Sequence, residues 1–232
     1  MLQRIAEAAA PEHEALVYEI GPGRGALTKH LAPRCDRLVA VELDRTLIAP
    51  LQVQFPSVEV VETDVLRFAF PREEQYVVCG NLPYYITSPI VEHVLAIGPG
   101  LKRAVFLVQK EVALRLAAQP RSRDYGYLSV ITQMASEVEV LFTVSPGAFA
   151  PPPKVDSAVV RIKPRPGGVM VPEELRKFVS RCFLQKRKTL RNNLALLYPA
   201  IEGRPEAGLR AEQLAVEEFP RLLASLVPAL TH

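Results

Sequence analysis

The sequence predicts an α/β protein with a Rossmann-like sheet, an antiparallel addition to that sheet and a small C-terminal helical domain. Short apolar runs of strand length alternate with helical patterns over the first two thirds of the chain. The first such run, 16–20, leads directly into a glycine loop, 21–25, followed by a helical pattern. A proline- and glycine-rich stretch, 164–168, then separates this pattern from a purely helical one. We therefore expect two domains, 1–164 and 165–232.

The composition is that of a globular chain: 49% of the 232 residues are hydrophobic, 23% are charged, and the formal net charge is +3. No apolar run approaches the roughly 18 residues of a membrane span, and the N-terminus lacks a signal-peptide pattern. The three cysteines, Cys35, Cys79 and Cys182, are too far apart for a disulfide framework or a zinc site. We expect core thiols, no metal, no membrane contact, and a cytoplasmic monomer.

Apolar and β-branched runs place the expected strands, each bounded by turn residues. They are expected at 16–20, 38–41, 58–61, 76–78, 104–108, 138–144 and 157–162. The first five alternate with helical or loop segments, as strands of a parallel sheet do. The last two follow each other closely, and we expect them to form an antiparallel pair at the edge of the sheet.

Helical periodicity and helix-ending residues place the expected helices. They are expected at 1–10, 26–31, 88–98, 111–119, 128–135 and 212–226, with a further helical stretch from 172 onward. Pro33 ends the second of these. Ser88 is expected to cap the third, with Pro89 at its first position.

Three carboxylates stand at or beside the ends of the first three expected strands. Glu19 precedes the first glycine, Glu42 follows the second strand, and Asp64 follows the third. Gly21 and Gly23 allow the backbone to turn sharply and approach a ligand. In such a fold Glu42 can accept hydrogen bonds from ribose hydroxyls, and a carboxylate such as Asp64 can accept one from an adenine amine.

The glycine loop also fits a nicotinamide dinucleotide enzyme, since Gly21, Gly23 and Ala26 match that spacing. Taken singly, a carboxylate at a strand end is more often a solvated side chain than a ligand. Acidic residues at three successive strand ends favour S-adenosylmethionine as the cofactor, and hence a methyltransferase.

The segment 81–84, Asn-Leu-Pro-Tyr, follows the fourth expected strand. The Asn81 carboxamide can accept from an amine, Pro83 stiffens the turn, and the Tyr84 ring offers a face for a flat base. Together they could hold an exocyclic amine. An isolated motif of this kind is more often an ordinary polar turn, and the upstream carboxylates are what favour the ligand hypothesis.

Two later segments carry further candidate contacts. A proline-rich run, 146–157, is stiff and could present Phe149 to a ligand, although a rigid connector with Phe149 in the core explains it equally well. Between residues 172 and 191 basic residues far outnumber acidic ones, which suggests phosphate contacts rather than only a solvated helical face. The candidate phosphate contacts are Lys186, Arg187, Lys188 and Arg191.

These motifs resemble those of the ribosomal RNA adenine dimethyltransferases, and among them the bacterial small-subunit group. The resemblance runs from about residue 2 to the end and is carried by 19–28, 41–44, 80–85, 149–160 and 186–194. It implies dimethylation of adenosine N6 in small-subunit ribosomal RNA, with S-adenosylmethionine as the cofactor.

The same resemblance implies a role for each candidate residue. Glu19, Gly21 and Gly23 would line the methionine side of the cofactor, Glu42 its ribose and Asp64 its adenine, with Asn81 also bordering it. Asn81 and the Leu82 carbonyl would hold the target amine within the catalytic segment Asn81, Leu82, Pro83 and Tyr84. Tyr84 and Phe149 would stack on the base.

One departure and two alternatives accompany the resemblance. The family begins with a lead-in segment that contains Gln-Asn-Phe-Leu, whereas this chain starts at Met1 inside the first helix. We therefore expect about twenty residues of that lead-in to be missing. Without them we expect the cofactor to bind more weakly. The large-subunit relative that confers macrolide resistance is disfavoured by the proline-rich segment and by the pattern 189–193. A non-catalytic RNA-binding or ribosome-assembly factor is the alternative from another class.

Overall fold

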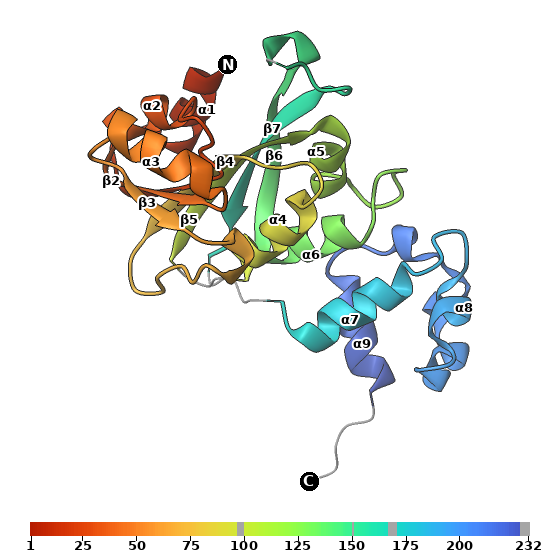
Figure 1. The fold of residues 1–232 in the computed structure, drawn as a ribbon. Coiled ribbons are helices and arrows are strands. Elements are labelled where there is room, and N and C mark those ends of the chain that lie inside the picture. The colour runs from red at the N-terminus through yellow and green to blue at the C-terminus, as the bar shows by residue number, and fades with distance from the viewer. Residues whose placement is uncertain (97–99, 150, 167–170, 228–232) are drawn as a thin grey trace. The chain divides into compact units, whose positions relative to one another are not determined.

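The structure is a computed structural model of the chain, and it describes residues 1–96, 100–149, 151–166 and 171–227. Among these residues a seven-stranded sheet has the order β3-β2-β1-β4-β5-β7-β6 (Figure 1). The strands are β1 (Glu14–Ile20), β2 (Cys35–Glu42), β3 (Glu59–Glu62), β4 (Tyr76–Asn81), β5 (Leu101–Gln109), β6 (Ser136–Val144) and β7 (Ser157–Pro164). The expected α/β class with an antiparallel edge is confirmed.

Strands β1 to β5 are parallel, and their carboxyl ends meet at one edge of the sheet. Ile20 of β1 pairs with Val41 of β2 on one side and with Gly80 of β4 on the other. The chain order therefore reverses between β1 and β4, which is the position where open α/β sheets bind ligands. Gly80 permits this close pairing. A Cβ at this position would lie only 2.6 Å from the carbonyl oxygen of Ile20, which leaves no room for a side chain.

Helices cover both faces of the parallel strands. On one face lie α1 (Leu2–Ala9), α2 (Thr28–Leu31) and α3 (Arg45–Gln54) (Figure 1). Their buried residues, such as Ile5, Leu31 and Leu51, share one apolar core with Val17 and Val77 of the sheet. These contacts bury the apolar stripe of each helix, which is what stabilises helices too short to persist alone.

The opposite face carries an aromatic cluster beneath α4 (Thr87–Leu95). Tyr18 and Tyr76 are neighbours on the sheet with ring centroids 5.3 Å apart, and both contact the ring of Phe70. His93 of α4 lies over Phe70 and contacts the carbonyl oxygen of Phe68 at 3.0 Å. This packing joins the C-terminal part of α4 to the segment after β3.

The antiparallel edge forms as expected: β7 pairs with β5, and β6 pairs with β7. The chain nevertheless divides differently from the expected boundary between residues 164 and 165. The first compact unit is Met1–Leu114 with Ser136–Met170, and the second is Arg115–Ala135 with Val171–His232. The second unit therefore includes α6 (Tyr127–Ala135), which precedes β6 directly in sequence.

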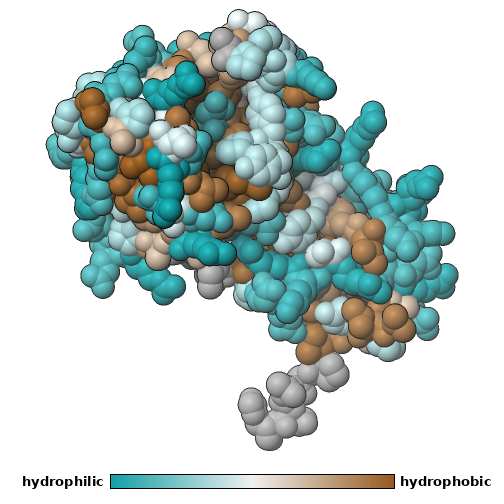
Figure 2. Space-filling view, viewed as in Figure 1, coloured by the Kyte–Doolittle hydropathy of each residue, from teal (hydrophilic) through white to brown (hydrophobic). Residues whose placement is uncertain are grey.

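The second unit has an apolar core of its own. Val130 and Ile131 of α6 belong to the same cluster as Phe178 of α7 (Glu173–Cys182) and Phe219 of α9 (Glu218–Leu226). A domain boundary drawn from linker composition could not find this arrangement, because the polar loop before α6 resembles any other loop in a single domain. On the face shown in Figure 2, hydrophilic side chains cover most of the outer surface of this unit.

Several expected elements differ in extent or kind. β4 runs to Asn81, so this residue ends the strand rather than following it. α4 begins at Thr87 after Ile86, and Ser88 does not cap it. α3 was not predicted, because Pro50 lies inside it. The long C-terminal helix is replaced by 3₁₀ turns and the shorter α9, and Gly98 lies outside the described residues.

The close approach of β1 and β4 can be tested with Gly80→Ala. The added Cβ would meet the backbone of Ile20, which cannot move without disturbing the sheet, so we expect the free energy of unfolding to fall by about 1–3 kcal/mol. Urea denaturation measures this change. Gly147→Ala is the control: its Cβ meets no atom within 4 Å, and its effect should stay within about 0.5 kcal/mol. Equal stability of both variants would contradict the proposed constraint.

Candidate functional site

A pocket of about 250 Å³ opens at the carboxyl edge of β1, β2 and β3. Its lining comprises Ile20, Gly21, Val41, Glu42, Leu43, Asp44, Thr63, Asp64, Val65, Pro83, Tyr85, Ile86 and Ile90. The structure thus brings Gly21, Glu42 and Asp64 together, as the sequence predicted. Glu19, Gly23 and Asn81 are not part of this lining.

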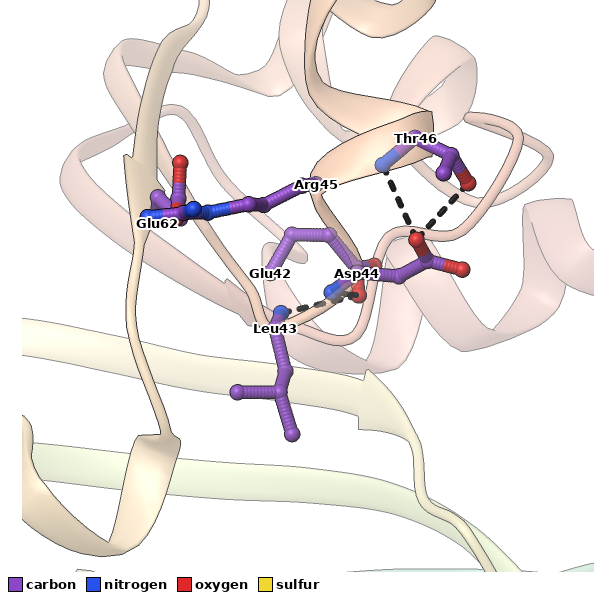
Figure 3. A network of polar contacts seen from close by, with 6 residues as sticks. All are labelled: Glu42, Leu43, Asp44, Arg45, Thr46 and Glu62. Carbon is purple, nitrogen blue, oxygen red and sulfur yellow. Dashed lines mark hydrogen bonds and ion pairs between the residues drawn. The ribbon is translucent and has the colours of Figure 1, made fainter.

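Glu42, at the end of β2, accepts hydrogen bonds from two loops, and Figure 3 shows its contacts with the loop that follows β2. One carboxylate oxygen accepts hydrogen bonds from the backbone N–H groups of Leu43 and Asp44, both at 2.9 Å. The other accepts from the backbone N–H of Gly23 at 3.1 Å. A carboxylate has about four lone-pair directions, so one acceptor position remains for a further donor.

The loop after Glu42 is fixed in turn by the start of α3 (Figure 3). The Asp44 carboxylate caps this helix, accepting from the Thr46 backbone N–H at 2.9 Å and from the Thr46 hydroxyl at 2.7 Å. These hydrogen bonds stabilise the charged form and lower the pKa of Asp44 below its ordinary value. Arg45 forms an ion pair with Glu62 at the end of β3.

The glycine loop takes a backbone conformation that other residues adopt only with strain. Gly21 and Gly23 have φ of 64° and 60°. No heavy atom lies within 4 Å of a Cβ placed at either position, so the space beside the loop is open. The loop is tied to β2 by the hydrogen bond from the Gly21 N–H to the Val41 carbonyl oxygen, at 3.0 Å.

Glu19 is almost completely buried, with 1% of its surface exposed. Its carboxylate accepts a 2.7 Å hydrogen bond from the hydroxyl of Thr28, the first residue of α2. Burial raises the pKa of Glu19 from 4.5 to about 7; the hydrogen bond from Thr28 opposes this rise, and the nearby charge of Glu42 adds to it. The side chain therefore lies inside the protein rather than at the pocket surface.

Asp64 lies two residues after the end of β3, and its carboxylate accepts from the Leu66 backbone N–H at 2.9 Å. Leu43, Val65 and Tyr85 are among the apolar lining residues that were not predicted from the sequence. Leu43 and Tyr85 are 64% and 83% exposed, which is unusual for large apolar side chains. Each of the three directly follows a predicted site residue, which is the signal that could have identified them.

A second pocket, of about 270 Å³, shares Pro83 with the first. It is lined by Asn81, Leu82, Pro83, Tyr84, Phe149, Pro151 and Pro153. The four residues of the predicted segment are therefore brought together with Phe149, although Phe149 lies 65 or more residues further along the chain. Phe149 also packs against the apolar core, so it is both a lining and a packing residue.

The loop 82–87 is held by hydrogen bonds at both ends. The Leu82 N–H donates to the Leu107 carbonyl of β5 at 3.0 Å, and the Thr87 hydroxyl donates to the Pro83 carbonyl at 3.1 Å. The Tyr84 hydroxyl is 2.7 Å from the Ser157 hydroxyl at the start of β7. No pattern in the sequence predicts a contact between these two residues.

The predicted basic residues lie in the second unit, and three of the four fall in the turn between α7 and α8 (Leu190–Leu194) rather than on a helix. The Lys186 ammonium is bound to the protein itself, donating to the carbonyl oxygens of Arg123 and of Tyr125, the latter at 3.1 Å. Arg187, Lys188 and Arg191 are exposed, and within the described part of the chain their side chains form no hydrogen bond or ion pair. These three are therefore free to meet an anion.

Membrane spans and metal sites are considered for residues 1–96, 100–149, 151–166 and 171–227. No helix there is both long and apolar enough to cross a bilayer. In the same ranges no three histidine, cysteine, aspartate or glutamate side chains are grouped so that they could hold a metal ion. The three cysteines are buried as free thiols.

The chain is similar to one protein family, to bacterial proteins of known sequence and to solved structures. Residues 1–216 match the family model of ribosomal RNA adenine dimethylase. The ribosomal RNA small subunit methyltransferase A of Acidobacterium capsulatum is 48% identical over 229 residues, covering 90% of this chain and 81% of the relative.

Two solved structures have the same fold over nearly the whole chain. A dimethyladenosine transferase from Plasmodium falciparum superposes with a TM-score of 0.81 and 26% identity, covering 97% of this chain and 94% of that one. The 23S rRNA methyltransferase ErmE gives a TM-score of 0.71 and 31% identity, covering 97% and 96%. Because the family model matches residues 1–216 and a relative that is 48% identical aligns with 90% of the sequence, the chain belongs to the ribosomal RNA adenine dimethylase family.

Proposed function

We propose that this chain transfers methyl groups from S-adenosylmethionine to the N6 amine of adenosines in small-subunit ribosomal RNA, giving N6,N6-dimethyladenosine. The main support for this proposal is that two pockets share one lining residue. Pro83 lies on the walls of both pockets, so a nucleoside in one pocket and a base in the other would approach each other at this residue. Two adjoining sites of this kind are what transfer between a cofactor and a flat substrate requires.

The first pocket fits the nucleoside part of S-adenosylmethionine. Glu42 keeps an acceptor position for the ribose hydroxyls, and Asp64 can accept from the adenine amine. Leu43, Val65 and Ile90 offer apolar surface for the faces of the adenine ring. The fit supports S-adenosylmethionine over a nicotinamide dinucleotide, since the neighbouring pocket contains a carboxamide and aromatic rings suited to a second base.

The second pocket fits the target adenosine. S-adenosylmethionine supplies an activated sulfonium methyl group, so the chain's task is to place the N6 nitrogen in line with it. The Asn81 carboxamide oxygen and the Leu82 carbonyl oxygen can accept from the amine and orient its lone pair. Tyr84 and Phe149 supply aromatic faces for an unstacked base, as in other enzymes that act on single nucleotides.

Glu19 is suited to the cationic amino group at the methionine end of the cofactor. Its carboxylate accepts a hydrogen bond from Thr28, and in sequence the residue stands two positions before Gly21, the first glycine of the loop. A cation close to this buried group would lower its pKa from about 7 and favour the charged form.

The second unit is suited to the RNA backbone. Arg187, Lys188 and Arg191 are exposed cations without partners in the described chain, and phosphate contacts of this kind supply most of the sequence-independent affinity for RNA. The similarity to ErmE makes large-subunit RNA the alternative substrate. A non-catalytic assembly factor is the alternative without chemistry.

The experiment that decides among these functions is methyl transfer from labelled S-adenosylmethionine to unmodified small and large ribosomal subunits, supplied in separate reactions. Nucleosides are then analysed for N6,N6-dimethyladenosine. We expect label in small-subunit RNA only. Label in large-subunit RNA alone would support the ErmE-like alternative, and binding to small subunits without any transfer would support the assembly factor.

Replacing the carboxamide in Asn81→Ala should reduce methyl transfer by about a hundredfold or more, the usual scale for a polar group that stabilises developing charge. Asn81 does not line the nucleoside pocket, so cofactor affinity should stay within about threefold of wild type. Single-turnover methylation and calorimetric titration of S-adenosylmethionine separate the two quantities. Near-normal turnover in this variant would remove Asn81 from the catalytic residues.

Glu19→Gln tests the buried carboxylate through the pH dependence of stability. Because folding raises the pKa of Glu19 from 4.5 to about 7, the folded state binds a proton more tightly than the unfolded state. The wild type should therefore lose stability relative to the variant as pH rises from 4.5 to about 7, and not beyond. The total difference should be on the order of 3 kcal/mol, at about 1.4 kcal/mol per pKa unit.

Urea denaturation at several pH values measures this difference in the absence of cofactor. The control is Glu12→Gln, which removes an exposed carboxylate from the same unit and should differ little from wild type at any pH. A constant difference between wild type and Glu19→Gln from pH 4 to pH 8 would show that the Glu19 carboxylate is not buried in solution.

Arg187→Ala tests the phosphate contacts. Loss of one contact should lower by about one unit the slope of log affinity against log salt for small-subunit RNA. Filter binding at several salt concentrations gives this slope. The control is Lys177→Ala on α7, whose ammonium lies 3.6 Å from Glu173, and the slope should not change there. An unchanged slope in Arg187→Ala would show that Arg187, in the turn between α7 and α8, is a solvated side chain that does not contact RNA phosphates.

A further inference from the structure

Tyr84 and Ser157 are 73 residues apart in sequence and joined by a single hydrogen bond of 2.7 Å between their hydroxyl groups. Tyr84 lies in the loop after β4 and forms part of the wall of the base pocket, whereas Ser157 does not line that pocket. Ser157 is completely buried. The bond therefore connects a partly exposed ring in a loop to a residue inside the sheet.

The position of Ser157 is determined by strands on both sides. It is paired with Gln109 of β5 and with Val144 of β6, so β7 is held in the sheet where this residue lies. The preceding residue is fixed as well, because the Lys110 N–H donates to the Asp156 carbonyl oxygen at 2.9 Å. A hydroxyl on such a strand has a defined place, unlike one on a loop.

We propose that Ser157 is a positioning residue that holds the Tyr84 ring against the wall of the base pocket and thereby allows the second methyl transfer to the same nitrogen. This inference rests on the proposed function. The Tyr84 loop is anchored elsewhere through Leu82 and Pro83, but those bonds are to backbone atoms and leave the ring free to rotate about its side-chain torsions. The bond to Ser157 is the contact that fixes the far end of the ring.

The second transfer depends more on the ring than the first. In each transfer the methyl carbon leaves sulfur as its bond to N6 forms, and the nitrogen releases one proton to solvent. After the first transfer N6 carries a methyl group, and the pocket of about 270 Å³ must hold the base together with this added carbon. A ring that rotates into the pocket would occupy that space, and a misplacement of about 1 Å can slow a reaction by up to about a hundredfold.

The test is the product ratio formed by Ser157→Ala on unmodified small ribosomal subunits. We expect the ratio of N6,N6-dimethyladenosine to N6-monomethyladenosine at a fixed time to fall about tenfold or more, while the rate of the first transfer falls less. Tyr84→Phe keeps the ring but lacks the hydroxyl, so it should give the same ratio. The product ratio of the double variant should be no lower than that of either single variant, because each substitution removes the same hydrogen bond. Ser157→Thr, which retains a hydroxyl, should restore dimethylation.

Ser136→Ala is the matched control, since Ser136 is an equally buried serine in the neighbouring strand, beside Pro164 at the opposite end of β7. Its product ratio should equal that of wild type. Wild-type ratios in both Ser157→Ala and Tyr84→Phe, or losses that multiply in the double variant, would overturn the inference. If Ser157→Ala does not fold, the product ratio of Tyr84→Phe alone tests the inference. A wild-type chain that methylates no adenosine would overturn the proposed function and this inference with it.

Discussion

The candidate site depends first on the Glu42 carboxylate, which binds three backbone N–H groups from two different loops. Such hydrogen bonds to a charged acceptor are stronger than neutral ones, and burial strengthens them further. Through them the glycine loop after β1 and the loop after β2 keep a fixed separation, although neither loop is part of the sheet. The position of the first pocket follows from this one side chain together with the register of β1 and β2.

The second constraint is the close pairing of β1 with β4, which brings the segment after Asn81 beside the glycine loop. Gly80 permits this approach, and the buried aromatic cluster around Tyr18 and Tyr76 fixes the helix that follows. The two pockets then share Pro83 because both lie at the point where the strand order reverses. Both pockets that we propose for the reacting partners are thus lined by residues of the first unit, whereas the exposed cations that we propose for RNA belong to the second unit.

Much of this could be predicted from local patterns. Strand ends, the glycine loop, the three carboxylates and the segment 81–84 are short-range features, and their meeting at one edge follows from parallel pairing. Contacts between distant segments could not be predicted. Sequence patterns do not show that Tyr84 meets Ser157, that Lys186 binds the carbonyl of Tyr125, or that α6 packs with the C-terminal helices. Helix α3 was missed because proline lowers helix propensity, yet its N-terminal cap and packing stabilise it.

We propose that one adenosyl group binds in the first pocket and one target adenosine in the second, with Pro83 lining both. The most direct measurement is a crystal structure of the chain with S-adenosylhomocysteine and adenosine. The account predicts ribose hydroxyls of the cofactor product within hydrogen-bond distance of Glu42, and the N6 amine of adenosine facing the Asn81 carboxamide. A ribose bound away from Glu42, or an adenosine that lies outside the pocket of Tyr84 and Phe149, would contradict it.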